Sequence, residues 1–184
     1  MTTALILIDI QNEYFPGGKN ELEGPLEAAA QAGKLLDFFR QQKWPTVHIQ
    51  HIATRPAART FTAGTKGVKI HAAVAPLERE TIIVKHFPNS FHETTLLEHL
   101  KGAGVEHLVI CGMMTHMCVD ASMRAGADLG FPVLLAEDAC ATRALEYGET
   151  KVPAQQVQAA FLAALKSYGQ VITTEKILEI LKTA

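Results

Sequence analysis

The chain lacks the features that mark secreted and membrane proteins. It has only three cysteines, Cys111, Cys118 and Cys140, which are too few for the disulfide framework of a small secreted protein. Its first residues carry neither the basic segment nor the cleavage site of a signal peptide. No apolar run approaches the ~18 residues that a membrane-spanning helix needs. We therefore expect a cytoplasmic protein with free thiols and no membrane partner.

An excess of charge of either sign is also absent. The 184 residues include 17 Lys and Arg against 19 Asp and Glu, for a net charge of −2, and no basic cluster interrupts the sequence. This balance argues against nucleic acid as a partner, and we expect a small-molecule substrate instead. With 48% hydrophobic and 20% charged residues, the composition is that of a folded globular protein.

Short apolar runs alternate with helical patterns along the chain. The runs have the length of strands and are mostly unbroken, as in strands covered on both faces. They are Leu5–Ile8, Thr46–Ile49, Thr81–Val84, His107–Cys111, Pro132–Leu135 and Gln170–Ile172. Helices are predicted over Leu26–Gln42, Thr94–Leu100, Cys118–Leu129, Pro153–Tyr168 and Thr174–Leu181. The alternation predicts one Rossmann-like domain over residues 1–184, with three α/β/α layers and a six-stranded, mostly parallel sheet.

Three reactive side chains stand where predicted strands end. Asp9 closes the first strand, Lys85 closes the third, and Cys118 follows the fourth strand by one tight turn. Ligands of parallel sheets bind beyond the carboxyl ends of the strands. The start of a helix can also activate a cysteine, because its backbone N–H groups favour the thiolate. We therefore expect these three groups to converge at one edge of the sheet.

Three segments that contain these residues carry a family resemblance: Leu7–Phe15, Val84–Phe91 and Gly112–Val119. They resemble the isochorismatase-like cysteine hydrolases, which include nicotinamidases, carbamoylsarcosine amidohydrolase, ureidoacrylate amidohydrolase and streptothricin hydrolase. The similarity extends over essentially the whole chain, including Ala136–Thr142. It implies a sheet of strand order 3-2-1-4-5-6.

The resemblance also implies a catalytic triad and a mechanism. Asp9 would act as general base, Lys85 would stabilise the developing negative charge, and Cys118 would attack an amide or ureido carbonyl to form a thioester. Backbone N–H groups of Met114 and Cys118 would form the oxyanion hole. In the family a non-proline cis peptide shapes this hole, and the matching bond here joins Met113 and Met114.

A metal site is not expected. Metal-dependent nicotinamidases of this family carry an Asp-x-His set after the second strand. Here His51 stands where the Asp would fall and Ala53 where the first His would fall. His48 and His51, three apart on a strand, should also point to opposite faces of the sheet. We therefore predict neither a metal nor another cofactor.

Four side chains are candidates for substrate contact: Phe15, His51, Phe91 and Thr115. Phe15 and Phe91 lie shortly after Asp9 and Lys85, which favours the pocket wall over the core for both. His51 is near the end of the second strand, and Thr115 lies in the turn that leads to Cys118.

Three functions remain open from the sequence. The leading one is hydrolysis of a C–N bond in a small amide or ureido compound by a cysteine hydrolase. The second is cleavage of a vinyl ether by Asp9 alone, as in true isochorismatases, which usually lack the cysteine. The third is a non-catalytic, redox-responsive binding module with an oxidisable Cys118, although such a module needs no paired base.

The C-terminal part of the chain suggests self-association. The predicted helices over Val157–Leu165 and Ile177–Leu181 are apolar, and the long loop Arg55–Gly67 has no evident partner within the chain. Apolar area that one domain cannot cover commonly becomes an interface between identical subunits. We therefore expect a homodimer or homotetramer, with the loop close to Cys118 of its own or of a neighbouring chain.

Overall fold

A six-stranded parallel sheet forms the centre of the computed structural model, which describes residues 2–55 and 57–183. The strands lie in the order β3-β2-β1-β4-β5-β8, and every neighbouring pair is parallel. They are β1 (Thr3–Ile8), β2 (Thr46–His51), β3 (Thr81–Lys85), β4 (His107–Met113), β5 (Val133–Ala141) and β8 (Gln170–Ile172). The predicted fold and the strand order implied by the family resemblance are confirmed.

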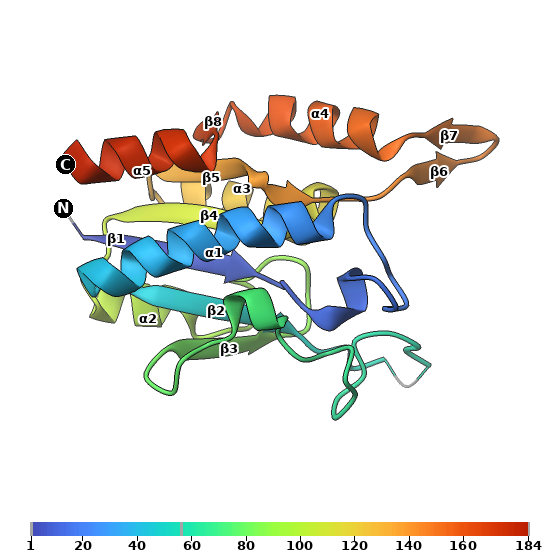
Figure 1. The fold of residues 1–184 in the computed structure, drawn as a ribbon, viewed down its shortest axis with the longest axis horizontal. Coiled ribbons are helices and arrows are strands. Elements are labelled where there is room, and N and C mark those ends of the chain that lie inside the picture. Colours follow the sequence, from blue (N-terminus) through green and yellow to red (C-terminus); the bar gives the residue numbers. More distant parts are fainter. Residues whose placement is uncertain (1, 56, 184) are drawn as a thin grey trace.

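Helices cover both faces of the sheet (Figure 1). They are α1 (Pro25–Gln42), α2 (Leu96–Gly102), α3 (Asp120–Asp128), α4 (Ala154–Leu165) and α5 (Thr174–Thr183). Helices α1 and α5 pack with Leu5 and Leu7 of β1 on one face, while α2, α3 and α4 pack with Ile6 and Ile8 on the other. Successive strand residues point to opposite faces, so an unbroken apolar strand packs against the helices on both sides of the sheet.

A glycine allows two central strands to approach closely. Gly112 of β4 lies beside Ile8 of β1, with a φ of +134°. A Cβ at this position would lie 2.0 Å from the carbonyl oxygen of Ile8, so a larger residue would force the strands apart. The ends of β1 and β4 are thereby held together, directly before Asp9 and before the turn that carries Cys118.

Two parts of the chain differ from the sequence prediction. Strand β5 extends past the predicted Leu135 to Ala141 and therefore includes Cys140. The charged residues Glu137 and Asp138 interrupt the apolar pattern, and Asp138 instead accepts hydrogen bonds from the backbone N–H and the hydroxyl of Thr174, at the start of α5. A hairpin of β6 (Leu145–Tyr147) and β7 (Thr150–Val152) was not predicted, and it projects from the body of the molecule (Figure 1).

The helix after β4 also begins differently. Thr115–Val119 form a single π-helical turn, and α3 follows from Asp120. The Val119 N–H bonds to the Met114 carbonyl five residues back, at 3.2 Å, which widens the turn. Cys118 therefore lies inside this wide turn and not at the first residue of a helix running from Cys118 to Leu129.

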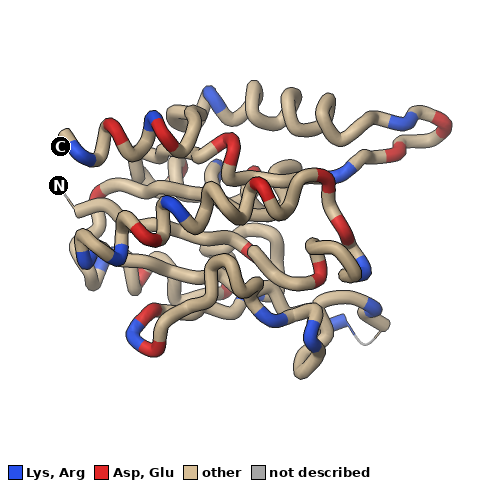
Figure 2. The backbone as a smooth tube through the Cα atoms, in the orientation of Figure 1, with Lys and Arg blue, Asp and Glu red and all other residues tan. Residues whose placement is uncertain are grey.

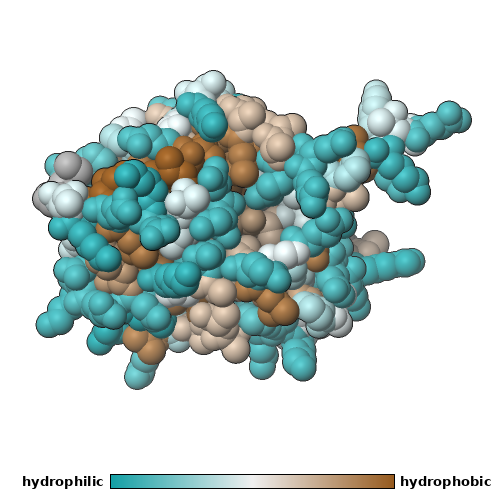
Figure 3. Space-filling view, turned by 45° about the horizontal axis from the view of Figure 1, so that its top comes forward, coloured by the Kyte–Doolittle hydropathy of each residue, from teal (hydrophilic) through white to brown (hydrophobic). Residues whose placement is uncertain are grey.

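The molecular surface mixes charges but leaves one helix face apolar. Lys, Arg, Asp and Glu of both signs are spread over the backbone in Figure 2. On the side of α4 and α5, apolar surface gathers in Figure 3. Along α4, the residues Ala159, Ala160, Ala163 and Ala164 are exposed, and Phe161 and Leu162 are partly so. Within the described residues, no helix is both long and apolar enough to cross a membrane.

We expect this α4 face to form part of a subunit interface. Sedimentation or light scattering at micromolar concentration should give about twice or four times the 20.0 kDa chain mass. Placing a charge on the exposed face with Ala163→Glu should shift the mass towards that of one chain, whereas Lys101→Glu on α2 should leave it unchanged. A mass near 20 kDa for the unmodified protein would contradict this prediction.

Candidate active site

A buried ion pair forms the floor of the site. Lys85 Nζ lies 2.7 Å from Asp9 Oδ2, and neither side chain is exposed to solvent. Lys85 also donates a hydrogen bond to the carbonyl oxygen of Phe87 at 3.0 Å. Apart from the ion pair, the carboxylate oxygens of Asp9 have no hydrogen-bond partner among the described residues. The carboxylate therefore keeps lone pairs that can accept a proton.

Cys118 lies against this ion pair and is almost fully buried, with 4% of its surface exposed. Burial raises the pKa of the Cys118 thiol well above its usual range, and the Asp9 charge raises it further, while Lys85 lowers it. Burial by itself lowers the pKa of Lys85, but the charge of Asp9 and the hydrogen bonds to Asp9 and Cys118 outweigh it, so the pKa is raised. The resting site thus holds a protonated thiol beside a charged ammonium, not the stored thiolate expected of a helix N-terminus.

The turn that carries Cys118 follows a cis peptide bond and is hydrogen-bonded to the end of β5. The Met113–Met114 peptide bond is cis. On the side of β5, the Thr115 hydroxyl donates to the Ala141 carbonyl oxygen at 3.2 Å, and the His116 ring bonds to the Thr142 hydroxyl through Nδ1. His116 is therefore engaged away from the thiol.

Of the three predicted catalytic residues, Cys118 lines a cavity, and the buried Asp9–Lys85 pair lies beside its sulfur. A space of about 660 Å³ opens above Cys118, with Met114 beside it. Its walls come from five segments that lie far apart in the sequence. They are Tyr14, Asn20, His51, Ala53, Thr54, Arg55, Ala57, Ala58, Thr60, Phe61, His86, Phe87, Pro88, Met117 and Arg143. A cavity of this size fits a small molecule.

Of the four predicted substrate contacts, only His51 lines this cavity. Phe15 stacks on His71 with ring centroids 3.6 Å apart, and Phe91 stacks on Phe131 at 6.5 Å. Thr115 is fully buried, and its hydroxyl donates a hydrogen bond to the backbone of β5. None of these three side chains lines the cavity, so their positions do not support the sequence prediction.

Other aromatic side chains take the places expected of Phe15 and Phe91. Tyr14, one residue before Phe15, faces the cavity because Asn12–Tyr14 form a 3₁₀ turn that rotates the chain after β1. Phe87 lines the cavity where Phe91 was expected. Both lie inside the segments that carry the family resemblance, so the sequence identified the right segments but the wrong face of each.

The loop after β2 is tied over the site by two buried polar residues. Glu13 accepts a hydrogen bond from the Phe61 N–H at 3.0 Å, and Gln11 donates to the Val68 carbonyl oxygen at 2.6 Å. Gln11 also exchanges hydrogen bonds with the backbone of His51. These contacts bring the loop close to the chain's own Cys118, which was one of the two expected locations.

The two histidines of β2 have separate roles. His51 lines the cavity, and burial lowers its pKa. His48 bonds through Nε2 to Glu80 at 3.0 Å, and Glu80 also forms an ion pair with Arg40 at 2.7 Å. Within the part of the chain that the structure describes, no group of three His, Cys, Asp or Glu side chains is placed to hold a metal.

Known proteins share this fold. The family model described as the isochorismatase domain matches residues 3–176. The chain belongs to the isochorismatase family. It is 51% identical over 180 residues to the uncharacterised family protein YddQ of Bacillus subtilis, which covers 97% of this chain and 100% of that protein. A solved isochorismatase-type hydrolase from Oleispira antarctica has a TM-score of 0.93 at 48% identity, over 97% of this chain and 96% of that one.

We predict that the two charges of the ion pair stabilise the fold only together. Lys85→Met and Asp9→Asn should each lower the free energy of unfolding by about 3–5 kcal/mol, because each leaves a buried charge without a partner. The double variant should lose much less than the sum of the two. Urea unfolding followed by circular dichroism measures all three. The exposed Lys101→Met serves as control and should change little, and additive losses would contradict the prediction.

Proposed function

We propose that this isochorismatase-family hydrolase is a cysteine amidohydrolase that cleaves a C–N bond in a small amide or ureido compound. The observation that carries the proposal is the placement of Cys118 beside the buried Asp9–Lys85 pair, at the base of the 660 Å³ cavity. Vinyl-ether hydrolysis by Asp9 alone would need no such nucleophile.

The reaction follows from the charges of these three groups. As the sulfur attacks the substrate carbonyl, the thiol proton passes to the free lone pairs of Asp9, and Lys85 offsets the negative charge. A backbone N–H from Met114 or Cys118 stabilises the tetrahedral oxyanion. Asp9 then returns the proton to the leaving nitrogen, which departs as ammonia or an amine. Water hydrolyses the remaining thioester and restores the thiol.

The names of two relatives bear on the reaction class. Streptothricin hydrolase of Streptomyces noursei is 31% identical over 144 residues, which cover 76% of this chain and 49% of that protein. Ureidoacrylate amidohydrolase of Caulobacter vibrioides is 25% identical over 171 residues, 75% of this chain and 76% of that protein. Both names indicate hydrolysis of a small molecule, and that of the amidohydrolase supports C–N cleavage as the reaction class.

Activity should depend on one of the three cysteines. In a screen of small amides and ureides for ammonia release, Cys118→Ala and Asp9→Asn should each lower kcat/KM by more than about 1,000-fold. Cys111→Ala and Cys140→Ala should keep most of the activity, because neither side chain lines this cavity. Ammonia release that survives in Cys118→Ala would exclude a cysteine mechanism, and retained cleavage of a vinyl ether by that variant would favour the alternative reaction.

The covalent intermediate can be tested by trapping. Hydroxylamine attacks a thioester faster than water does, so an amide substrate should yield its hydroxamate in addition to the free acid. The hydroxamate should form with the unmodified protein and be absent with Cys118→Ala. Product analysis by mass spectrometry decides the question. If the free acid forms at an unchanged rate and no hydroxamate is found, water attacks the substrate directly.

A further inference from the structure

The second half of the proposed reaction, in which water removes the acyl group from the sulfur, needs a base. Asp9 is fully buried and does not line the cavity above Cys118. Once the sulfur carries an acyl group, water reaches the thioester from the cavity. A base must lie within hydrogen-bond reach of that water, directly or through one further water. The base for this step therefore belongs on the cavity wall.

Two of the described residues that line the cavity are histidines, and none is Asp or Glu. His86 is exposed, and its Nδ1 already bonds to the carbonyl oxygen of Ile52 at 2.7 Å. His51 is half-buried, and neither of its ring nitrogens bonds to a described residue, because its hydrogen bonds are made by the backbone. A buried ring nitrogen without a protein partner is typical of a group that serves in catalysis or binds water.

The sheet places His51 beside the ion pair. It is the residue of β2 that pairs with Lys85 of β3. Each of the two lies two positions after an isoleucine, Ile49 or Ile83, whose side chain packs on the same face of the sheet as Cys118. Since side chains alternate along a strand, His51 and Lys85 point to that face as well. Neighbouring strands are ~4.8 Å apart, so the imidazole stands next to the Lys85 side chain.

The ring of His51 is held in place and uncharged. It packs edge-on against Phe61 with ring centroids 5.4 Å apart. The backbone N–H and carbonyl of His51 both bond to the Gln11 side chain at 2.9 Å. Burial lowers the pKa of His51, and this effect exceeds the opposing effect of the Asp9 charge. At neutral pH the imidazole is therefore neutral, and its lone pair can accept a proton.

We propose that His51 is the base of the second half-reaction, in which water hydrolyses the acyl group on Cys118. This proposal rests on the proposed function, because it assigns one step of the same reaction. The water oxygen bonds to the thioester carbon while one water proton passes to the His51 ring. The C–S bond then breaks, the acid is released, and the proton passes from His51 to the sulfur. The thiol and the neutral imidazole are both restored.

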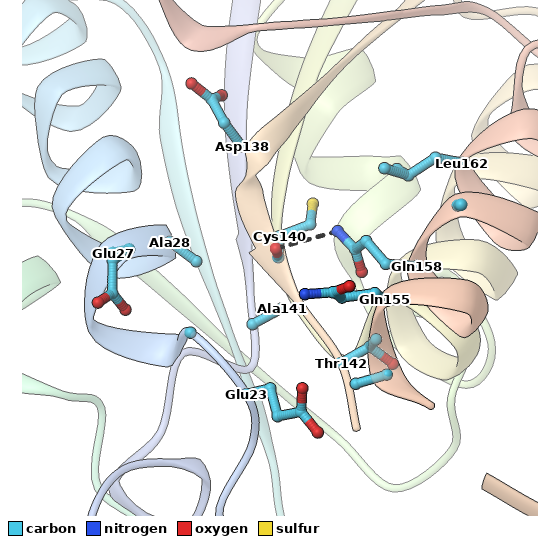
Figure 4. A pocket seen from close by; sticks show the side chains of 13 residues that line it. Glu23, Glu27, Ala28, Asp138, Cys140, Ala141, Thr142, Gln155, Gln158 and Leu162 are labelled. Atoms are coloured by element: carbon cyan, nitrogen blue, oxygen red, sulfur yellow. Dashed lines mark hydrogen bonds between the residues drawn. The ribbon is translucent and has the colours of Figure 1, made fainter. Parts of the chain in front are cut away.

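A second cavity of the protein provides an internal contrast. It has a volume of about 430 Å³, and Cys140 lines it together with the acidic residues Glu23, Glu27 and Asp138. Figure 4 shows these side chains around the opening, with the hydrogen bond from Gln158 to the backbone of Cys140 at its centre. No histidine or lysine is among the described residues that line this cavity. Cys140 therefore has neither the ion pair nor the imidazole that accompany Cys118.

The proposal is tested with p-nitrophenyl acetate, a small activated ester that replaces the natural substrate. Attack by Cys118 releases coloured p-nitrophenolate and leaves an acetyl thioester on the sulfur. Absorbance follows the first step. Intact-protein mass spectrometry of acid-quenched samples gives the acetylated fraction, and the two measurements together give the rates of acetylation and deacetylation. Peptide mass spectrometry should find the acetyl group on Cys118 and not on Cys140.

One substitution separates the two steps. His51→Gln keeps a polar side chain but removes the base. Acetylation should stay within about threefold of the original rate, whereas deacetylation should fall by about 100-fold, so the acetyl form accumulates. His99→Gln makes the same change at a half-buried histidine of α2 that does not line this cavity, and both rates should be unchanged. Damage to the fold would slow acetylation as well, which distinguishes it from loss of the base.

The pH dependence of the unmodified protein provides a measurement that needs no variant. Deacetylation should be lost as the pH falls through the lowered pKa of His51, because the protonated ring cannot accept a proton. Around this ring stand Asp9, Lys85 and His86, and the cavity wall adds Tyr14, Arg55 and Arg143. The residual deacetylation of His51→Gln should lack this titration, which assigns it to His51 and not to His86.

Acetylation of Cys118 with an unchanged deacetylation rate in His51→Gln would overturn this proposal alone, and so would a deacetylation rate of the unmodified protein that does not vary with pH. If Cys118 takes no acetyl group, the nucleophile is refuted, and with it both proposals. Deacetylation that depends on His51, without ammonia release from any amide or ureide, would refute the proposed C–N substrate and leave the role of His51 in place.

Discussion

The ion pair between Asp9 and Lys85 is the interaction on which the site depends. Both side chains are fully buried, and either charge alone in such surroundings would cost several kcal/mol. The sheet fixes their separation. β1 and β3 flank β2 in parallel register, with Lys85 paired to His51 at the end of β2. The pair can form only when all three strands are in register, which couples the chemistry of the site to the fold.

The same pair and the burial of the site determine the state of the nucleophile. Asp9 raises the pKa of the Cys118 thiol and Lys85 lowers it, while burial is the largest influence and raises it. Burial makes the thiolate form of Cys118 less stable than the neutral thiol when no substrate is bound. In the proposed reaction the charge develops only as the proton moves to Asp9 and a carbonyl carbon is in reach. The buried site therefore favours the thiol at rest and an anion only during attack.

Much of the fold and part of the site could be predicted from the sequence, for a physical reason. Unbroken apolar runs identify strands buried on both faces, and the ends of parallel strands must meet at one edge, so Asp9, Lys85 and Cys118 could be placed together. The extension of β5 was missed because Asp138 interrupts the apolar run and therefore resembles the end of a strand. In the structure Asp138 lies within β5 and accepts hydrogen bonds from Thr174, the first residue of α5. Phe15 was chosen over Tyr14 because a 3₁₀ turn of three residues decides which ring faces the cavity.

The cavity walls could not be predicted, because long-range contacts position them. Phe61 is held by Glu13, 48 positions away in the sequence, and Thr142, next to the wall residue Arg143, bonds to His116, 26 positions away. Such contacts leave no periodic signal. They also divide the site into two parts. The reacting groups stand on strand ends that every fold of this type must bring together, whereas the walls stand on loops that can change without disturbing the sheet. Proteins of this fold can therefore act on different molecules, because the walls can vary while the strand ends stay in place.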